Sequence, residues 1–221
     1  GNTDLEIRNL KLKNPDVLAS NGNAGILISG DSSQEVQQVK LSRITVYGDQ
    51  ISVGVGGYAS SVGGIIGALK AKTLVLDQVE LFGSQVLIQK NGGGATGGLI
   101  GSLNITDSMA IGNCAFSGYV TGSSDPYNTG GTGGLIGQLV TSPACTGKIM
   151  LSNCYVAGRN LAAQVSNGTD GTEFLKDGIN LVGGNKVGGV SGELTGSLAV
   201  SNSFCTAGIY DRANETAQAA G

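Results

Sequence analysis

The sequence contains no histidine and no tryptophan, and only 3 of its 221 residues are proline. Without histidine the chain cannot build a Ser-His-Asp triad, a histidine-ligated zinc site or a histidine general base from its own residues. Charged residues make up 13% of the chain and the net charge is −3, and the lysines and arginines are scattered, which disfavours nucleic acid as a partner. No run of about 18 apolar residues is present, so the sequence predicts no membrane span.

Glycine is abundant instead, with 39 residues against a usual share of about 7%. Hydrophobic residues still make up 40% of the chain, which is enough for a buried core and argues against simple disorder. Collagen is excluded, because proline is scarce and no Gly-X-Y period appears. The glycines are therefore expected to serve a folded, repetitive architecture.

A glycine-rich motif recurs along the chain. Its copies are Gly63-Gly64-Ile65-Ile66-Gly67, Gly97-Gly98-Leu99-Ile100-Gly101, Gly133-Gly134-Leu135-Ile136-Gly137 and Gly188-Gly189-Val190-Ser191-Gly192, with a weaker copy at Ala24-Gly25-Ile26. Each is followed by apolar residues at a spacing of two that lead to an Asn-like corner, at positions 9, 43, 78, 113, 153 and 202. A period of about 35 residues with this spacing predicts stacked β-coils, because helical repeats space their apolar residues by three and four.

Strand alternation within each unit predicts which side chains face the interior. The expected inward residues are Leu99, Leu103, Met109 and Ile111. The expected apolar patch on the outside consists of Ile66, Ile100 and Ile136. The corner asparagines are expected to stack as a ladder, because Asn tolerates unusual backbone angles and its amide bonds to neighbours. The glycines are expected at tight corners, where a positive φ or the absence of Cβ is needed.

These patterns predict a mainly β fold, a single-stranded parallel β-helix (β-solenoid) of five to six coils with three short strands per coil, right-handed as crossover connections usually are. Residues 1–212 are expected to form the solenoid, with loops at 84–96 and 119–132 and an irregular long loop at 159–187. Residues 213–221 are expected to form a frayed tail or a short capping segment. Because the chain starts in mid-coil, we expect a piece of a longer protein with neighbouring domains. A β-propeller or β-sandwich is the alternative architecture.

Two units also resemble a known repeat. The string Gly97–Gly101 with Ile111–Gly122, and the copy from Gly133 to Gly158, are similar to the GLUG repeat of bacterial surface proteins. Other units depart from it, since Gln78 replaces the corner Asn in one. The resemblance implies a secreted or cell-surface, adhesin-like protein, and some proteins with this repeat are IgA-cleaving metallopeptidases whose repeats lie apart from the catalytic domain. No catalytic residue is carried over, because the repeat specifies architecture more than activity.

The cysteines allow two interpretations. Cys114 and Cys154 fall in an inward column, so they are expected either as small apolar side chains or as a disulfide, since adjacent coils lie about 4.8 Å apart. Spacing alone leaves the pairing of Cys145 and Cys205 open. The sequence contains no C-x-x-C spacing and no histidine to complete a zinc site, so we expect no metal and no cofactor.

A polysaccharide-cleaving site would need several acidic residues in one outer column. Asp77, Glu80 and Glu193 each align with non-acidic residues in other units, so we expect no catalytic residue and no enzyme. Loops are then the expected carriers of function. Candidate binding residues are Tyr127, Phe174 and Lys176.

The long loop itself allows two interpretations. Residues Glu173–Val182 are expected to form a hairpin turning at Asp177-Gly178. This hairpin serves either as a binding loop or as a flap over the outer apolar patch.

The sequence thus predicts a non-catalytic extracellular module of a bacterial cell-surface protein, adhesin-like, that binds a host glycan or extracellular protein through edge loops. Two alternatives remain at this stage. One is a polysaccharide lyase or glycoside hydrolase on a β-helix, and the other is a structural spacer of a surface peptidase.

Overall fold

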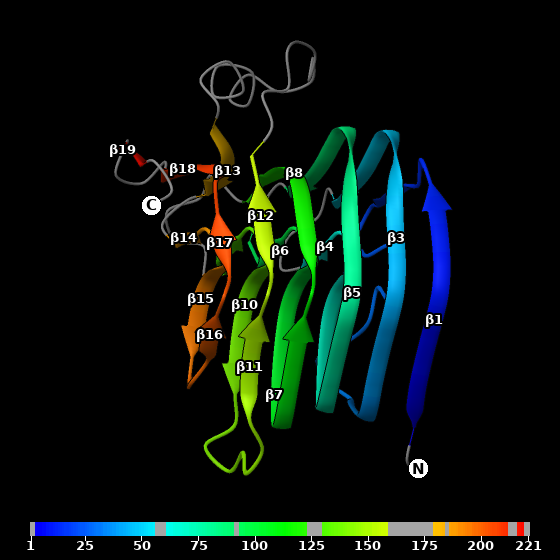
Figure 1. Ribbon diagram of the computed structural model, residues 1–221, viewed down its shortest axis with the longest axis vertical. Helices are drawn as coiled ribbons and strands as arrows, with labels where there is room; N and C mark the ends of the chain where they lie inside the picture. The colour runs from blue at the N-terminus through cyan, green and yellow to red at the C-terminus, as the bar shows by residue number, and fades with distance from the viewer. Residues whose placement is uncertain are drawn as a thin grey trace.

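The protein is described here by a computed structural model, over residues 3–55, 61–90, 93–122, 130–158, 179–183, 186–211 and 216–218. About 70% of it is strand, the described residues contain no helix, and the parallel sheets wind into a β-solenoid of about four turns (Figure 1). The predicted fold class is thereby confirmed. The turns number fewer than five to six because the first unit is incomplete, with a glycine segment that makes only isolated bridges, Ala24 to Val62 and Ile28 to Ile66.

Two sheets contain all the named strands. The larger sheet consists of β1 (Asp4–Lys13), β2 (Asp16–Ala19), β3 (Glu35–Val55), β5 (Ile66–Lys90), β7 (Ile100–Gly112), β8 (Ala115–Thr121), β10 (Ile136–Thr141), β11 (Ile149–Ser152), β12 (Tyr155–Ala157), β13 (Ile179–Gly183), β15 (Ser191–Thr195), β16 (Ala199–Ser201), β17 (Phe204–Cys205), β18 (Gly208–Asp211) and β19 (Thr216–Gln218). The smaller sheet consists of β4 (Val62–Gly63), β6 (Thr96–Gly97), β9 (Thr132–Gly133) and β14 (Val187–Gly188). Pairing is parallel throughout, except between β18 and β19.

The predicted corner column is present. The six residues share a left-handed backbone, with φ values of 58° at Asn9, 54° at Arg43, 57° at Gln78, 54° at Asn113, 53° at Asn153 and 47° at Asn202. Neighbouring turns are linked by corner side chains, since Asn153 Nδ2 donates to Asn113 Oδ1 at 3.4 Å. In the early turns the sheet ladder continues around this corner, so that β3 and β5 are long strands of 21 and 25 residues rather than short ones.

The interior is filled by the residues that alternation places there. Leu99, Leu103, Met109 and Ile111 are all buried, as predicted. The outer apolar patch was wrongly predicted, because Ile66, Ile100 and Ile136 are 0% exposed and belong to the core. The reason is an interruption of alternation in the glycine motif, where the amides of Leu99 and Ile100 both donate to the carbonyl of Leu135. Most of the expected flap, 159–187, lies outside the described residues.

None of the motif glycines has φ in the left-handed region. Glycine is needed at these positions because other backbone segments approach too closely for a side chain to fit. A Cβ at Gly97 would overlap the carbonyl oxygen of Ile100, three residues further on, so the chain folds back on itself without side chains between its arms. A Cβ at Gly98 would overlap the carbonyl oxygen of Gly134 in the next turn and lie 2.5 Å from Phe116 Cγ. We call this tight fold the glycine arch.

Several expected loops are strands. Residues 84–90 continue β5 up to Lys90, residues 119–121 complete β8, and β13 pairs in parallel with both β8 and β18. The parallel pairing of β13 does not fit one arm of a hairpin over 173–182, and residues 173–178 lie outside the described residues. In the tail, β19 pairs antiparallel with β18, so residues 216–218 form a short strand at the last turn.

Candidate binding face

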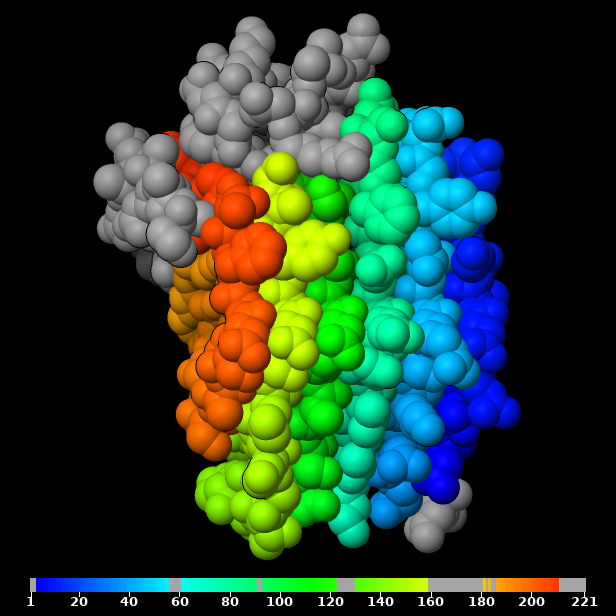
Figure 2. Space-filling model, in the orientation of Figure 1, coloured from blue at the N-terminus to red at the C-terminus, as the bar shows by residue number. Residues whose placement is uncertain are grey.

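One outer face of the solenoid presents its side chains in straight columns, because parallel strands stack in register. Figure 2 views this face, with the turns side by side from β1 to β16 and β17. The first column is Arg8, Ser42, Asp77, Gly112, Ser152 and Ser201, and the second is Glu6, Lys40, Val75, Ala110, Met150 and Ala199. Asp77 therefore aligns with the non-acidic residues Ser42, Gly112, Ser152 and Ser201, which confirms the prediction that no acidic residue shares its column.

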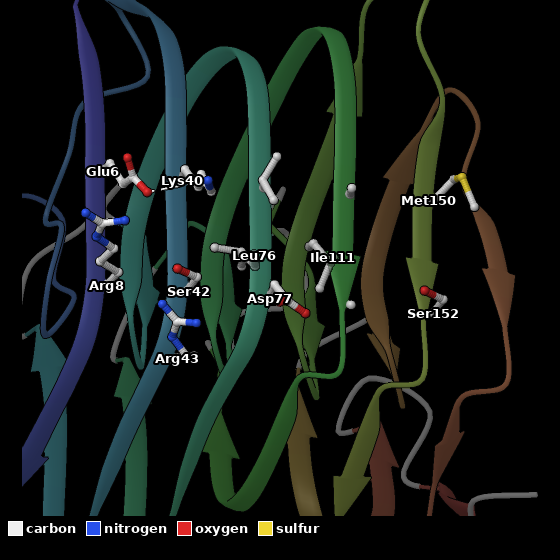
Figure 3. Close-up of a pocket in the computed structure, with 13 residues that line it drawn as sticks. Glu6, Arg8, Lys40, Ser42, Arg43, Leu76, Asp77, Ile111, Met150 and Ser152 are labelled. Atoms are coloured by element: carbon white, nitrogen blue, oxygen red, sulfur yellow. Dashed lines mark ion pairs between the residues drawn. The ribbon is translucent and has the colours of Figure 1, made fainter.

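These two columns enclose a shallow groove of about 510 Å³, which we call the outer groove (Figure 3). Its floor is low because Ala110 and Gly112 have little or no side chain. Its N-terminal end is polar, and there Lys40 Nζ lies 3.4 Å from Glu6 Oε1 with both side chains 46% exposed. An exposed pair of this kind adds little stability, so its groups remain available to a ligand.

A second hollow lies across the corner. It has a volume of about 780 Å³ and is lined by Asn9, Lys11, Arg43, Thr45, Gln78, Glu80 and Asn113. Arg43 lines both hollows, and its Nε donates to Asn9 Oδ1, which orients the guanidinium along the corner. On the next turns Asn113 Nδ2 donates to Asp77 Oδ1 at 2.8 Å. Hydrogen-bonding groups therefore line the corner on both sides.

The column inside this corner hollow continues into exposed aromatic rings. In register it contains Lys11, Thr45, Glu80, Ala115, Tyr155 and Phe204. The rings of Tyr155 and Phe204 stack with centroids 5.6 Å apart and planes within 12°. They are 40% and 58% exposed, which is unusual for stacked aromatic side chains of this size. We call this column, from the polar residues to the rings, the corner track.

None of the binding residues predicted from the loops belongs to this face. Tyr127, Phe174 and Lys176 lie outside the described residues. The corner track was missed, although a signal for it exists, because each ring follows a corner Asn by two residues and alternation then places both rings on the outside.

Acidic residues do not gather in the columns that contain Glu80 and Glu193. Glu80 aligns with Thr45 and Ala115, and Glu193 aligns with Gln138, whose Nε2 donates to Glu193 Oε2 at 2.8 Å. Within the described part of the chain, no group of three or more cysteine, aspartate or glutamate side chains is placed to hold a metal ion.

All four cysteines are free thiols. Cys114 and Cys154 are buried on adjacent turns, and each donates to the carbonyl two residues before it, Gly112 at 3.1 Å and Ser152 at 3.2 Å. Contact with the Cys154 thiol and burial raise the pKa of Cys114 above its ordinary value. Both thiols therefore act as small core side chains, which is the first of the two interpretations offered by the sequence.

A buried cation was not predicted from the sequence. Lys90 points inward at the end of β5 and is 1% exposed, and its Nζ has no hydrogen-bond partner among the described residues. Burial lowers the pKa of its ammonium group to about 8, because the charged form loses its hydration. A buried unpaired charge destabilises the fold, so Lys90 is a feature that packing alone does not explain.

Comparison with models of known protein families, with curated proteins and with solved structures finds no match. Across the described residues, no helix has the length and apolar character needed to cross a membrane.

Proposed function

We propose that the chain is a non-catalytic, adhesin-like module of a bacterial cell-surface protein that holds an extended glycan along the corner track. The observation that carries the proposal is the exposed stack of Tyr155 and Phe204 in register with the polar end of that track. Aromatic rings bind the apolar faces of sugar rings, while nearby amides, carboxylates and guanidinium groups bind hydroxyls.

The spacing of the track suits a polymer. Successive turns present one side chain about every 4.8 Å, which is close to the length of one sugar ring in an extended chain. A ligand lying parallel to the solenoid axis would pass Lys11, Thr45 and Glu80, cross the small Ala115, and reach the aromatic rings. Repeat proteins commonly use such long surfaces for binding.

Surface location is proposed on the resemblance of two units to the GLUG repeat. Host glycan is favoured over protein because the track is narrow and lined by hydrogen-bonding groups, and its main apolar feature is one pair of rings. The alternative is a structural spacer of a surface peptidase, and that function requires no ligand.

The test is binding of the full 221-residue chain to an array of glycans and extracellular-matrix proteins. The decisive variant is Tyr155→Ser with Phe204→Ser, which changes only exposed rings. Phe82→Ser is the matched control, because Phe82 is an aromatic residue 38% exposed on the neighbouring outward column. Circular dichroism establishes that each variant keeps the solenoid fold.

We expect a glycan signal that falls at least tenfold in the double variant and stays within twofold of wild type in Phe82→Ser. Binding that is unaffected by loss of both rings would refute the corner track as the site. Absence of binding to every probe would favour the spacer.

A further inference from the structure

Two arginines lie close together at the N-terminal end of the outer groove, and we call them the arginine pair. Arg8 pairs with Ser42 on the adjacent strand, and Arg43 follows Ser42 along the chain. Both arginines are exposed and line the outer groove, and Figure 3 shows the Ser42 hydroxyl between them. Neighbouring guanidinium groups repel each other, so this placement requires a partner of opposite charge.

The carboxylates that line the groove do not neutralise the arginine pair. Glu6 Oε1 lies 3.4 Å from Lys40 Nζ. Asp77 Oδ1 accepts a hydrogen bond of 2.8 Å from Asn113 Nδ2. Among the residues that the structure describes, no carboxylate lies within ion-pair distance of either guanidinium group. The arginine pair therefore presents two positive charges to a ligand in the groove.

The donor geometry favours an oxyanion as the missing partner. Arg43 Nε donates to Asn9 Oδ1, which orients the guanidinium and leaves its two terminal nitrogens to other acceptors. A guanidinium binds a carboxylate or a similar oxyanion through two parallel N–H donors, in a planar fork that lysine lacks. The Ser42 hydroxyl supplies a further donor in the same part of the groove.

From this arrangement we infer that the arginine pair binds an oxyanion, either a carboxylate or a sulfate group, and that the glycan on the corner track is acidic. The second part of the inference rests on the proposed function. Arg43 lines both the outer groove and the corner hollow, so a glycan on the corner track passes directly beside it. One sugar of that glycan can therefore place its acidic group on the arginine pair.

The strand register gives the separation between the acidic group and the stacked sugar. Arg43 and Thr45 belong to the same turn, and Tyr155 lies three turns beyond Thr45 on the corner track. Adjacent turns are about 4.8 Å apart, so the arginine pair and the rings are separated by about 14 Å along the solenoid axis. An extended glycan of about four sugars spans this distance. Shorter acidic glycans are expected to bind more weakly, because they reach only one of the two sites.

The first test is a titration of the full 221-residue chain with sodium sulfate and with sodium acetate. Sodium chloride keeps the ionic strength constant, and NMR of the arginine Nε–H groups reports binding. We expect saturable shifts in wild type. Arg8→Gln and Arg43→Gln should each weaken binding at least about tenfold, and Arg43→Lys should also weaken it, because lysine lacks the planar fork. Lys72→Gln with Lys148→Gln is the matched control, because both lysines are exposed and lie outside the groove.

The second test compares carboxylated, sulfated and neutral glycans of the same backbone on the glycan array. Wild type should bind the acidic members at least about tenfold more tightly than the neutral ones, and high salt should reduce this preference by screening the charges. Arg8→Gln with Arg43→Gln should remove the preference and keep the binding of neutral glycans by the rings. The array also distinguishes carboxylate from sulfate as the preferred group.

Two results would overturn the inference. They are a wild type without saturable shifts in either ion titration, and neutral glycans that bind as tightly as acidic glycans of the same backbone. Failure of the proposed function gives a different result. If no glycan binds, the proposed function and the acidic glycan are both refuted, whereas the ion titrations still decide whether the arginine pair binds oxyanions. Tyr155→Ser with Phe204→Ser should lose glycan binding and bind sulfate like wild type.

Discussion

Replacing Gln78 by glycine should raise the free energy of unfolding, although it removes a side chain and adds nothing. Gln78 is exposed and holds φ at 57°, a backbone conformation that costs a residue with a Cβ about 1–2 kcal/mol. Glycine avoids this cost, but the greater freedom of glycine in the unfolded chain takes back about 0.5–1 kcal/mol. The expected net gain is about 0.5–1 kcal/mol.

Gln85→Gly is the matched control, because Gln85 is also an exposed glutamine in β5 but is absent from the positive-φ positions. It should lower stability by about 0.5–1 kcal/mol, since a glycine in a strand gains no relief from strain. Urea unfolding followed by circular dichroism measures both. If Gln78→Gly lowered the midpoint as much as Gln85→Gly, the argument that the corner is strained would fail.

Two further predictions concern the interior. Lys90→Met should stabilise the protein by up to about 3 kcal/mol at pH 7, because the folded state holds an ammonium group whose pKa is about 8 rather than 10.5. Between pH 8 and 10.5 unfolding takes up a proton, so the free energy of unfolding of the wild type should rise with pH in this range. The variant should show no such rise when both proteins are unfolded with urea at pH 7 and at pH 10. Gly98→Ala should cost about 3 kcal/mol or prevent folding, because its Cβ would meet the Gly134 carbonyl and the Phe116 ring. Gly54→Ala should be tolerated, because the nearest atom would lie 3.5 Å from the added Cβ. Equal melting temperatures of the two variants would contradict the close backbone packing of the glycine arch.

Much of the fold could be predicted because parallel stacking repeats one set of constraints in each turn. Alternation fixed the inward residues, and the Asn-like positions marked where alternation shifts, so the registers of Asp77 and Glu80 followed directly. The glycine arch could not be foreseen from alternation. Two successive amides share one carbonyl there, and Ile100, expected outside, is buried.

The candidate site was harder to predict for a different reason. The binding residues predicted from the sequence, Tyr127, Phe174 and Lys176, belong to loops and lie outside the described residues. The outer groove and the corner track arise from residues far apart in sequence that share a column, such as Tyr155 and Phe204. Such a site can be recognised only when the strand register is known, because the register determines which side chains lie next to each other on the surface.

The glycine arch also constrains how this protein can change in length. Its backbones touch within a turn and between turns, so a residue inserted between Gly97 and Gly101 would have no space. The segments between an arch and the corners on either side of it carry no such restriction. The corner spacing grows in these segments from 34 to 49 residues while the ladders stay in register. A duplication or deletion of one whole turn would preserve every contact of the arch, so the number of turns can vary over generations more easily than the shape of any one of them.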